Sequence, residues 1–114
     1  MTPIVFGTDG WRAVVAREFT FENLARVSRA LARVWLEDQA LDGQALPVIV
    51  GHDTRFLSHD FAASVAEILV TAGFDVWLVD RPCSSPAVSW AVKERSARGA
   101  VMITASHNPP EYNG

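Results

Sequence analysis

Short apolar runs alternate with segments of helical periodicity along this chain. Pro47–Gly51 is a continuous apolar run, which predicts a strand buried on both faces. Two further runs, 74–79 and 100–103, predict two more strands. Helical patterns separate these three strands, and that order is typical of βαβ crossovers, which build a parallel sheet covered by helices. The pattern therefore predicts an α/β fold.

The first helix has the clearest start signal. Thr20 is a favourable N-cap, and Phe19 before it can pack against Leu24 as a hydrophobic staple. The pattern fades at 37–39, where we expect the helix to end. Its core-facing stripe is predicted to consist of Leu24, Val27, Leu31, Val34 and Trp35.

Two more helices are expected between the strands. Ser58 is the predicted cap of the second, and Gly73 its C-terminal stop. The third is predicted to begin after a cap at Ser85, with Pro86 at its first position, and to run to about Arg98.

The N-terminal segment allows two interpretations. The apolar runs 4–6 and 13–15 flank Gly7-Thr8-Asp9-Gly10-Trp11-Arg12, and the Asp-Gly pair favours a hairpin or a bent strand. The glycines would also let the backbone approach a ligand, and Arg12 offers a planar fork that suits a phosphate. Spacing alone leaves both interpretations open.

Polar side chains follow each predicted strand, where the carboxyl ends of parallel strands share one edge of the sheet. Ligands bind at that edge in open α/β sheets. Ser106 lies just past the last strand, and Pro109 and Pro110 stiffen the loop after it. We therefore expect an anionic or polar ligand at this edge, whose polar residues are His52, Asp53, Arg55, Ser84, Ser85, Ser106, His107 and Asn108.

Composition and charge exclude several classes of protein and of binding partner. The 114 residues suffice for one domain, 1–114, and the 49% hydrophobic content excludes disorder. A formal net charge of -3 argues against a nucleic-acid or anionic-membrane surface. No apolar segment is long enough to span a bilayer. Cys83 is the only cysteine, which rules out an internal disulfide and favours the cytoplasm. The chain stops directly after its most unusual loop, so we expect a piece of a longer, multidomain protein.

Phosphate chemistry fits the polar residues best. Ser106 and His107 are adjacent, and adjacent side chains seldom face each other; no Gly-x-Ser-x-Gly elbow is present either, so a serine hydrolase is disfavoured. The histidines and Cys83 lack metal-binding or redox spacing. A serine on a stiff loop can instead carry a phosphoryl group, with Arg12 and Arg55 as the forks that hold it. The phosphate could supply one ligand to Mg²⁺, but the chain offers no carboxylate cluster for the rest.

Three motifs carry a family resemblance. Phe6-Gly7-Thr8-Asp9-Gly10-Trp11-Arg12, Val50-Gly51-His52-Asp53-Thr54-Arg55 and Thr104-Ala105-Ser106-His107-Asn108-Pro109 resemble the first domain of the α-D-phosphohexomutases. Phosphoglucomutase, phosphomannomutase and phosphoglucosamine mutase belong to that family. The resemblance covers nearly the whole chain in the right order. It departs at position 13, where alanine replaces the usual glycine, and at Ser85-Pro86, where Thr-Pro is common.

The resemblance implies a fold and an activity. The fold would be a three-layer α/β/α domain with a mostly parallel, mixed sheet of about four strands. Ser106 would be the catalytic phosphoserine of an isomerase that moves a phosphoryl group between the 1- and 6-positions of a hexose phosphate, through a bisphosphorylated sugar. Arg12 would lie near that phosphate, and His107 and Asn108 would shape the loop around it. Thr8, Arg55 and Asn108 would contact the substrate or its phosphate.

It also implies partners outside the chain. Mg²⁺ would bridge the Ser106 phosphate and an aspartate-rich loop of another domain, and a sugar bisphosphate would act as activator. With those domains absent, we expect no turnover from this chain alone. Two other functions stay open, a non-catalytic phosphate-binding module of the same fold and a purely structural domain. The sequence does not identify the sugar.

Overall fold

A three-stranded parallel sheet with the order β3-β2-β4 forms the centre of the computed structural model, which describes residues 3–8 and 10–114. The middle strand β2 (Val48–His52) pairs with β3 (Val76–Leu78) on one side and β4 (Gly99–Ile103) on the other. All five residues of β2 are buried; the continuous apolar run predicted this for 48–51, whereas His52, expected among the polar residues of the sheet edge, is buried as well. Because the three strands run parallel, their carboxyl ends meet at one edge.

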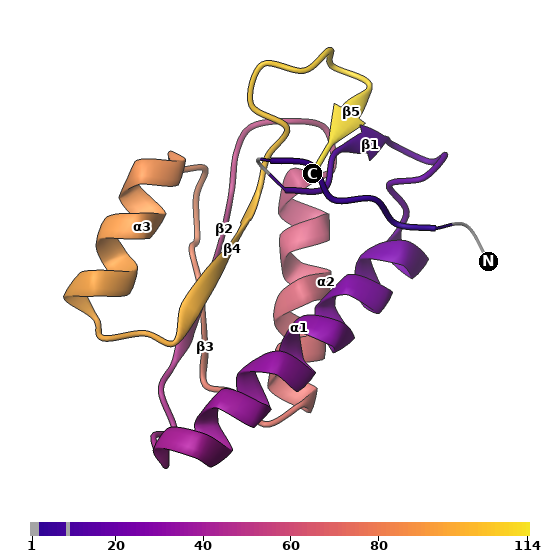
Figure 1. The fold of residues 1–114 in the computed structure, drawn as a ribbon. Coiled ribbons are helices and arrows are strands. Elements are labelled where there is room, and N and C mark those ends of the chain that lie inside the picture. The colour runs from indigo at the N-terminus through magenta and orange to yellow at the C-terminus, as the bar shows by residue number, and fades with distance from the viewer. Residues whose placement is uncertain (1–2, 9) are drawn as a thin grey trace.

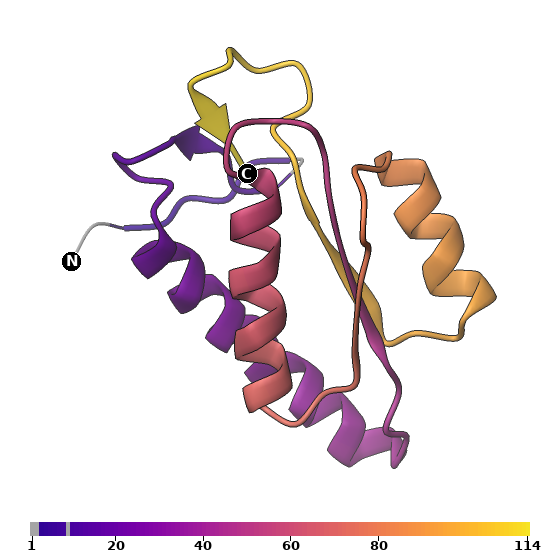
Figure 2. The ribbon, with the colours of Figure 1, turned by 180° about the vertical axis from the view of Figure 1, so that it is seen from behind.

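Helices cover both faces of this sheet. The helices α1 (Phe21–Asp42) and α2 (Ser58–Thr71) lie on one face and α3 (Ser85–Glu94) on the other, as the two opposite views show (Figure 1, Figure 2). The predicted α/β/α layers are therefore confirmed. Antiparallel pairing occurs in a separate two-stranded sheet, in which β1 (Ala13–Val14) pairs with β5 (Tyr112–Asn113).

Helix α1 begins as predicted and ends later. The Thr20 hydroxyl oxygen accepts a hydrogen bond of 3.1 Å from the backbone N–H of Asn23. The expected end at 37–39 is wrong: the helix runs on to Asp42, where Gly43 supplies the left-handed conformation, φ 70°, that stops it. Glu37, Gln39 and Ala40 are good helix formers, so this polar stretch does not end the helix. The predicted stripe is wrong at Val34, which is 53% exposed, while Ala32 packs in the core.

The predicted cap of α2 is wrong by one residue. Leu57 occupies the N-cap position with φ 63°, and Ser58 is the first helical residue. The Ser58 hydroxyl does not cap the helix because it donates to the Asp53 carboxylate at 2.6 Å. Gly73, with φ 103°, follows the last turn, so the predicted stop is confirmed.

Helix α3 also differs by one residue at its start. Ser84 is the cap, with its hydroxyl oxygen accepting from the Ala87 N–H at 3.3 Å, and Ser85 is the first helical residue. The helix ends at Glu94 rather than near Arg98, because the chain must turn before it enters β4 at Gly99.

The N-terminal segment joins the far end of the chain rather than forming its own hairpin. Residues 4–6 are not a strand, so the expected hairpin with 13–15 is wrong; β1 pairs with β5 instead. Gly7 and Gly10 form an isolated antiparallel bridge, in which the Gly7 N–H donates to the Gly10 carbonyl at 2.8 Å. Asp9, in the predicted turn, lies outside the described residues. The pairing with β5 brings Arg12 beside the loop of Ser106.

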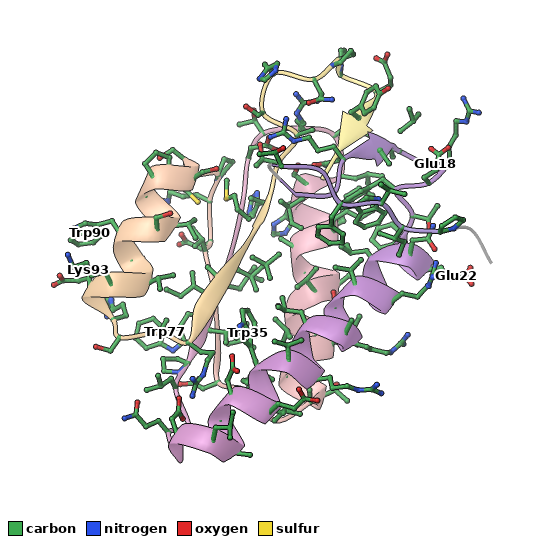
Figure 3. The ribbon with its side chains drawn as sticks, in the orientation of Figure 1. Glu18, Glu22, Trp35, Trp77, Trp90 and Lys93 are labelled. Atoms are coloured by element: carbon green, nitrogen blue, oxygen red, sulfur yellow. The ribbon has the colours of Figure 1, made fainter. Side chains whose placement is uncertain are left out.

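Aromatic side chains anchor that segment to α2. The rings of Trp11 and Phe19 lie 4.6 Å apart, and Phe19 meets Phe61 edge to face at 4.9 Å. Trp35 is also buried, whereas Trp90 is 65% exposed and projects from the outer side of α3 (Figure 3).

No helix in the described part of the chain combines the length and apolar character needed to cross a membrane.

Candidate functional site

The Ser106 loop rises from the carboxyl end of β4 and returns as β5, above the sheet edge (Figure 1). Ser106 is exposed and has φ 52°, a left-handed conformation that non-glycine residues seldom adopt. The Asn108 N–H donates to the Ala105 carbonyl at 2.9 Å, which closes a tight turn around Ser106. The loop therefore presents the Ser106 hydroxyl to solvent on a folded turn.

Asp53 at the end of β2 holds the base of this loop. One of its carboxylate oxygens accepts from the Thr104 hydroxyl at 2.7 Å, and the Thr104 oxygen in turn accepts from the Ser106 N–H at 3.1 Å. The other accepts from the Ser58 hydroxyl at 2.6 Å and from the Arg55 N–H at 2.9 Å. These contacts connect the ends of two neighbouring strands directly to the backbone of Ser106.

The environment of Asp53 favours its charged form. Burial alone would raise the pKa of the Asp53 carboxyl. The hydrogen bonds from Ser58, the Arg55 amide and Thr104, together with the positive charge of Arg55, outweigh that effect and lower the pKa of Asp53 below its usual value. Asp53 is thus an anion at neutral pH.

Arg55 lies beneath the loop, with its Nε 3.6 Å from the Asp53 carboxylate. Its side chain is only 15% exposed. Its terminal nitrogens donate four hydrogen bonds of 2.6–3.1 Å to carbonyl oxygens of the loop, those of Ser106, Asn108, Pro109 and Tyr112. The expected contact of Arg55 with a substrate phosphate stays a prediction; here both terminal nitrogens bind the loop.

Arg12 reaches the same loop from the N-terminal segment. Its Nη1 donates to the side-chain oxygen of Asn108 at 2.9 Å. Arg12, Ser106, His107 and Ser85 line one open cavity of about 1010 Å³, whose remaining walls are largely apolar side chains of α1 and β4. The predicted site residues Arg12, Ser106 and His107 thus line one cavity, while the predicted ligand residue Thr8 is exposed on the turn before Gly10.

Ser106 and His107 lie closer than adjacency suggested. The Ser106 hydroxyl oxygen is 3.4 Å from His107 Nδ1, and both side chains are exposed. The expectation that these neighbours would not face each other is wrong, because the left-handed turn at Ser106 brings the two side chains to the same side. A separation of 3.4 Å is longer than a strong hydrogen bond, but it allows proton exchange with small movement.

The described residues do not form a Mg²⁺ site by themselves. No three His, Cys, Asp or Glu side chains gather within 3–8 and 10–114. Asp53, at the base of the loop, is already bound by two hydroxyls and an amide. Mg²⁺ prefers several oxygen ligands in octahedral geometry, so the residues that the structure describes do not by themselves fit that ion.

Thr104, Ser58 and Asn113 were not predicted as site residues. Asn113 is fully buried; its amide nitrogen donates to the Ser58 hydroxyl at 2.9 Å and its oxygen accepts from the Gly114 N–H at 2.8 Å. A signal for Thr104 existed, because a hydroxyl and a carboxylate at the ends of adjacent strands are expected to meet. Asn113 had no such signal, since its partner lies on a helix 55 residues away.

Comparison with known proteins identifies the family. Residues 3–114 match the family described as phosphoglucomutase/phosphomannomutase, alpha/beta/alpha domain I. A phosphoglucosamine mutase of Trichormus variabilis is 42% identical over 113 residues, which cover 99% of this chain and 22% of that protein. A Schizosaccharomyces pombe protein described as a phosphoribomutase is 37% identical over 113 residues, covering 97% of this chain and 19% of that protein.

A solved structure has the same fold. The crystal structure assigned as a phosphomannomutase from Thermus thermophilus is 46% identical and superposes with a TM-score of 0.92 over 99% of this chain and 25% of that one. The chain spans about a fifth of the length of the curated relatives named above. With nearly all of its described residues matched, the chain belongs to the phosphoglucomutase/phosphomannomutase family, as its α/β/α domain I.

Proposed function

We propose that this chain supplies the phosphoserine loop of a sugar-phosphate mutase, with Ser106 as the residue that carries the phosphoryl group. The observation that carries the proposal is the Ser106 hydroxyl itself, exposed on a braced turn and lining one cavity with Arg12. Membership in a family whose relatives are named as mutases supports it. We propose that the substrate is a hexose phosphate and that the enzyme interconverts its 1-phosphate and 6-phosphate forms.

The chemistry is a pair of phosphoryl transfers. A sugar hydroxyl attacks the phosphorus of phosphoserine, the bond between phosphorus and the Ser106 oxygen breaks, and a bisphosphorylated sugar forms, while the proton of the attacking hydroxyl passes to the released Ser106 oxygen. The Ser106 hydroxyl then attacks the other phosphate of that sugar, the bond between this phosphorus and the sugar oxygen breaks, and the proton passes to that sugar oxygen, which leaves the isomeric monophosphate. Arg12 offsets negative charge beside the loop, and His107, 3.4 Å from the serine oxygen, passes a proton to or from it. The expected Mg²⁺, shared with an aspartate-rich loop outside this chain, and the sugar bisphosphate activator rest on the family resemblance alone.

Mass analysis of the peptide around Ser106, from protein purified from its native cells, tests the proposal. We expect a phosphate on Ser106, and incubation with a hexose 1,6-bisphosphate and Mg²⁺ should restore it where it has been lost. Ser106→Ala should abolish both the modification and turnover at native length. A Ser106 that is unmodified and refuses phosphate from the bisphosphate would leave the phosphate-binding module as the better function. In that case Ser106→Ala should keep its affinity for the sugar phosphate.

A further inference from the structure

The Ser106 loop folds around one guanidinium group. Four loop carbonyls, spread from Ser106 to Tyr112, converge on the terminal nitrogens of Arg55 at 2.6–3.1 Å. Carbonyl oxygens brought this close repel one another unless a cation or several donors lie between them. A guanidinium supplies both, because it carries a fixed charge and five N–H donors in one plane.

A second set of contacts fixes the other side of Ser106. The Ser106 carbonyl binds Arg55, while the Ser106 N–H binds Thr104, which itself donates to Asp53. Both backbone polar groups of Ser106 are therefore tied to the end of β2. A left-handed backbone is strained in a non-glycine residue, so the turn at Ser106, with φ 52°, persists only where neighbouring contacts hold it.

We infer that Arg55 is a positioning residue, which sets the direction of the Ser106 hydroxyl through the loop backbone and does not bind the substrate phosphate. This inference rests on the proposed phosphoryl transfer at Ser106. In-line transfer depends on the orientation of the attacking and leaving oxygens, and a displacement of about 1 Å can cost roughly a hundredfold in rate. Loss of Arg55 should thus lower kcat and leave KM nearly unchanged.

The matched variants are Arg55→Lys and Arg98→Lys. Lysine keeps the charge of Arg55 but cannot hold four separate carbonyls with one ammonium group. Arg98 is a suitable control because its side chain also donates three short hydrogen bonds, two to the Asp42 carboxylate and one to the Gln44 carbonyl. It lies just before β4 begins, which is the opposite end of the sheet from the loop.

Hydrogen exchange of the chain gives a readout that does not depend on activity. The N–H groups of Ser106, Asn108 and Tyr112 are each bonded within the loop. We expect Arg55→Lys to speed their exchange by roughly tenfold or more, while the amides of β2 stay protected and Arg98→Lys leaves the loop unchanged. Unchanged loop exchange in Arg55→Lys would overturn the inference.

Kinetics of the protein at its native length separate positioning from substrate binding. Arg55→Lys should lower kcat by roughly tenfold or more with KM within about twofold. Added guanidinium ion should partly restore kcat to Arg55→Ala, which keeps the test valid if lysine disturbs folding. A raised KM with unchanged kcat would instead assign Arg55 to the substrate phosphate. If wild-type Ser106 accepts no phosphate, the proposed function fails, and the exchange result still decides whether Arg55 holds the loop.

Discussion

Replacement of Thr104 by valine is the most direct test of the network beneath the loop. The Thr104 hydroxyl donates to the Asp53 carboxylate at 2.7 Å and accepts from the Ser106 N–H at 3.1 Å. Valine has nearly the same shape and can make neither contact. The substitution therefore removes two hydrogen bonds while leaving the packing around residue 104 almost unchanged.

The expected loss of stability follows from the surroundings of the two bonds. A hydrogen bond to a charged group contributes about 1.5–3 kcal/mol, and the 22% exposure of Asp53 favours the lower end. The exposed Ser106 N–H can turn to water, so its bond adds only about 0.5 kcal/mol. Thr104→Val should thus lower the free energy of unfolding by about 2 kcal/mol. With an unfolding entropy of about 2.1 cal/mol/K per residue over 114 residues, Tm should fall by roughly 8 °C.

Thermal unfolding followed by circular dichroism at pH 7 measures this change. Thr104→Ser is the control, because serine keeps the hydroxyl and loses only a methyl group. We expect serine to recover most of the stability that valine loses. The reasoning is refuted if valine melts within about 2 °C of the wild type, or if serine and valine are equally destabilised.

Three further predictions concern other parts of the molecule. Burial raises the pKa of Asp53, but hydrogen bonds from two hydroxyls and an amide, together with the charge of Arg55, outweigh it and lower the pKa. The stabilisation that the Asp53 carboxylate gives the fold is therefore complete above the unfolded pKa of about 3.9 and is lost as pH falls through the lower folded value. Tm measured from pH 6 downward should drop below about pH 4, and Asp53→Asn should flatten that drop. Gly51→Ala should destabilise by about 1–3 kcal/mol in urea unfolding, because a Cβ there would lie 2.7 Å from a Val88 methyl group and overpack the contact between β2 and α3; an unchanged midpoint would contradict this. The 114-residue chain alone should isomerise neither glucose nor mannose phosphate in a coupled assay, and detectable turnover would show that the site is complete within it.

The order of strands and helices could be predicted from apolar patterning, whereas several helix ends could not. The run at 47–51 becomes a strand buried on both faces because it is too short for a helix, is rich in β-branched residues and is bounded by Pro47 and Gly51. The predicted cap at Ser58 was wrong because a hydroxyl near the start of a helix can bind groups other than the helix backbone. Asp53, five residues earlier, takes that hydroxyl, and the helix begins without a side-chain cap.

The chemically distinctive side chains of the candidate site were singled out from the sequence, whereas its supporting residues, such as Thr104 and Asn113, and the contacts between its members were not. Ser106 and Arg12 stood out because each is a chemically distinctive side chain within a motif. The contacts of Arg55 are made with backbone carbonyls, whose directions depend on the φ of Ser106 and on the two prolines that follow. The pattern of side chains in a sequence does not predict where backbone carbonyls point. An arginine that binds loop carbonyls therefore cannot be told from one that binds a phosphate by the sequence alone.

Polar contacts, more than apolar burial, must determine the conformation of this loop. Ala105 is buried, but Ser106, His107 and 109–111 are exposed, so there is little apolar surface to hold the turn. The stabilising groups lie instead at and just beyond the end of β2, where Asp53 and Arg55 are positioned by the most deeply buried strand of the sheet. The Ser106 hydroxyl, the proposed phosphoryl carrier, can then be exposed and still have a fixed direction, because the turn that carries it is held by the sheet below it. It follows that a substitution at the end of β2 should disturb the proposed phosphoryl transfer at Ser106 more than an equally destabilising substitution at the far end of the sheet.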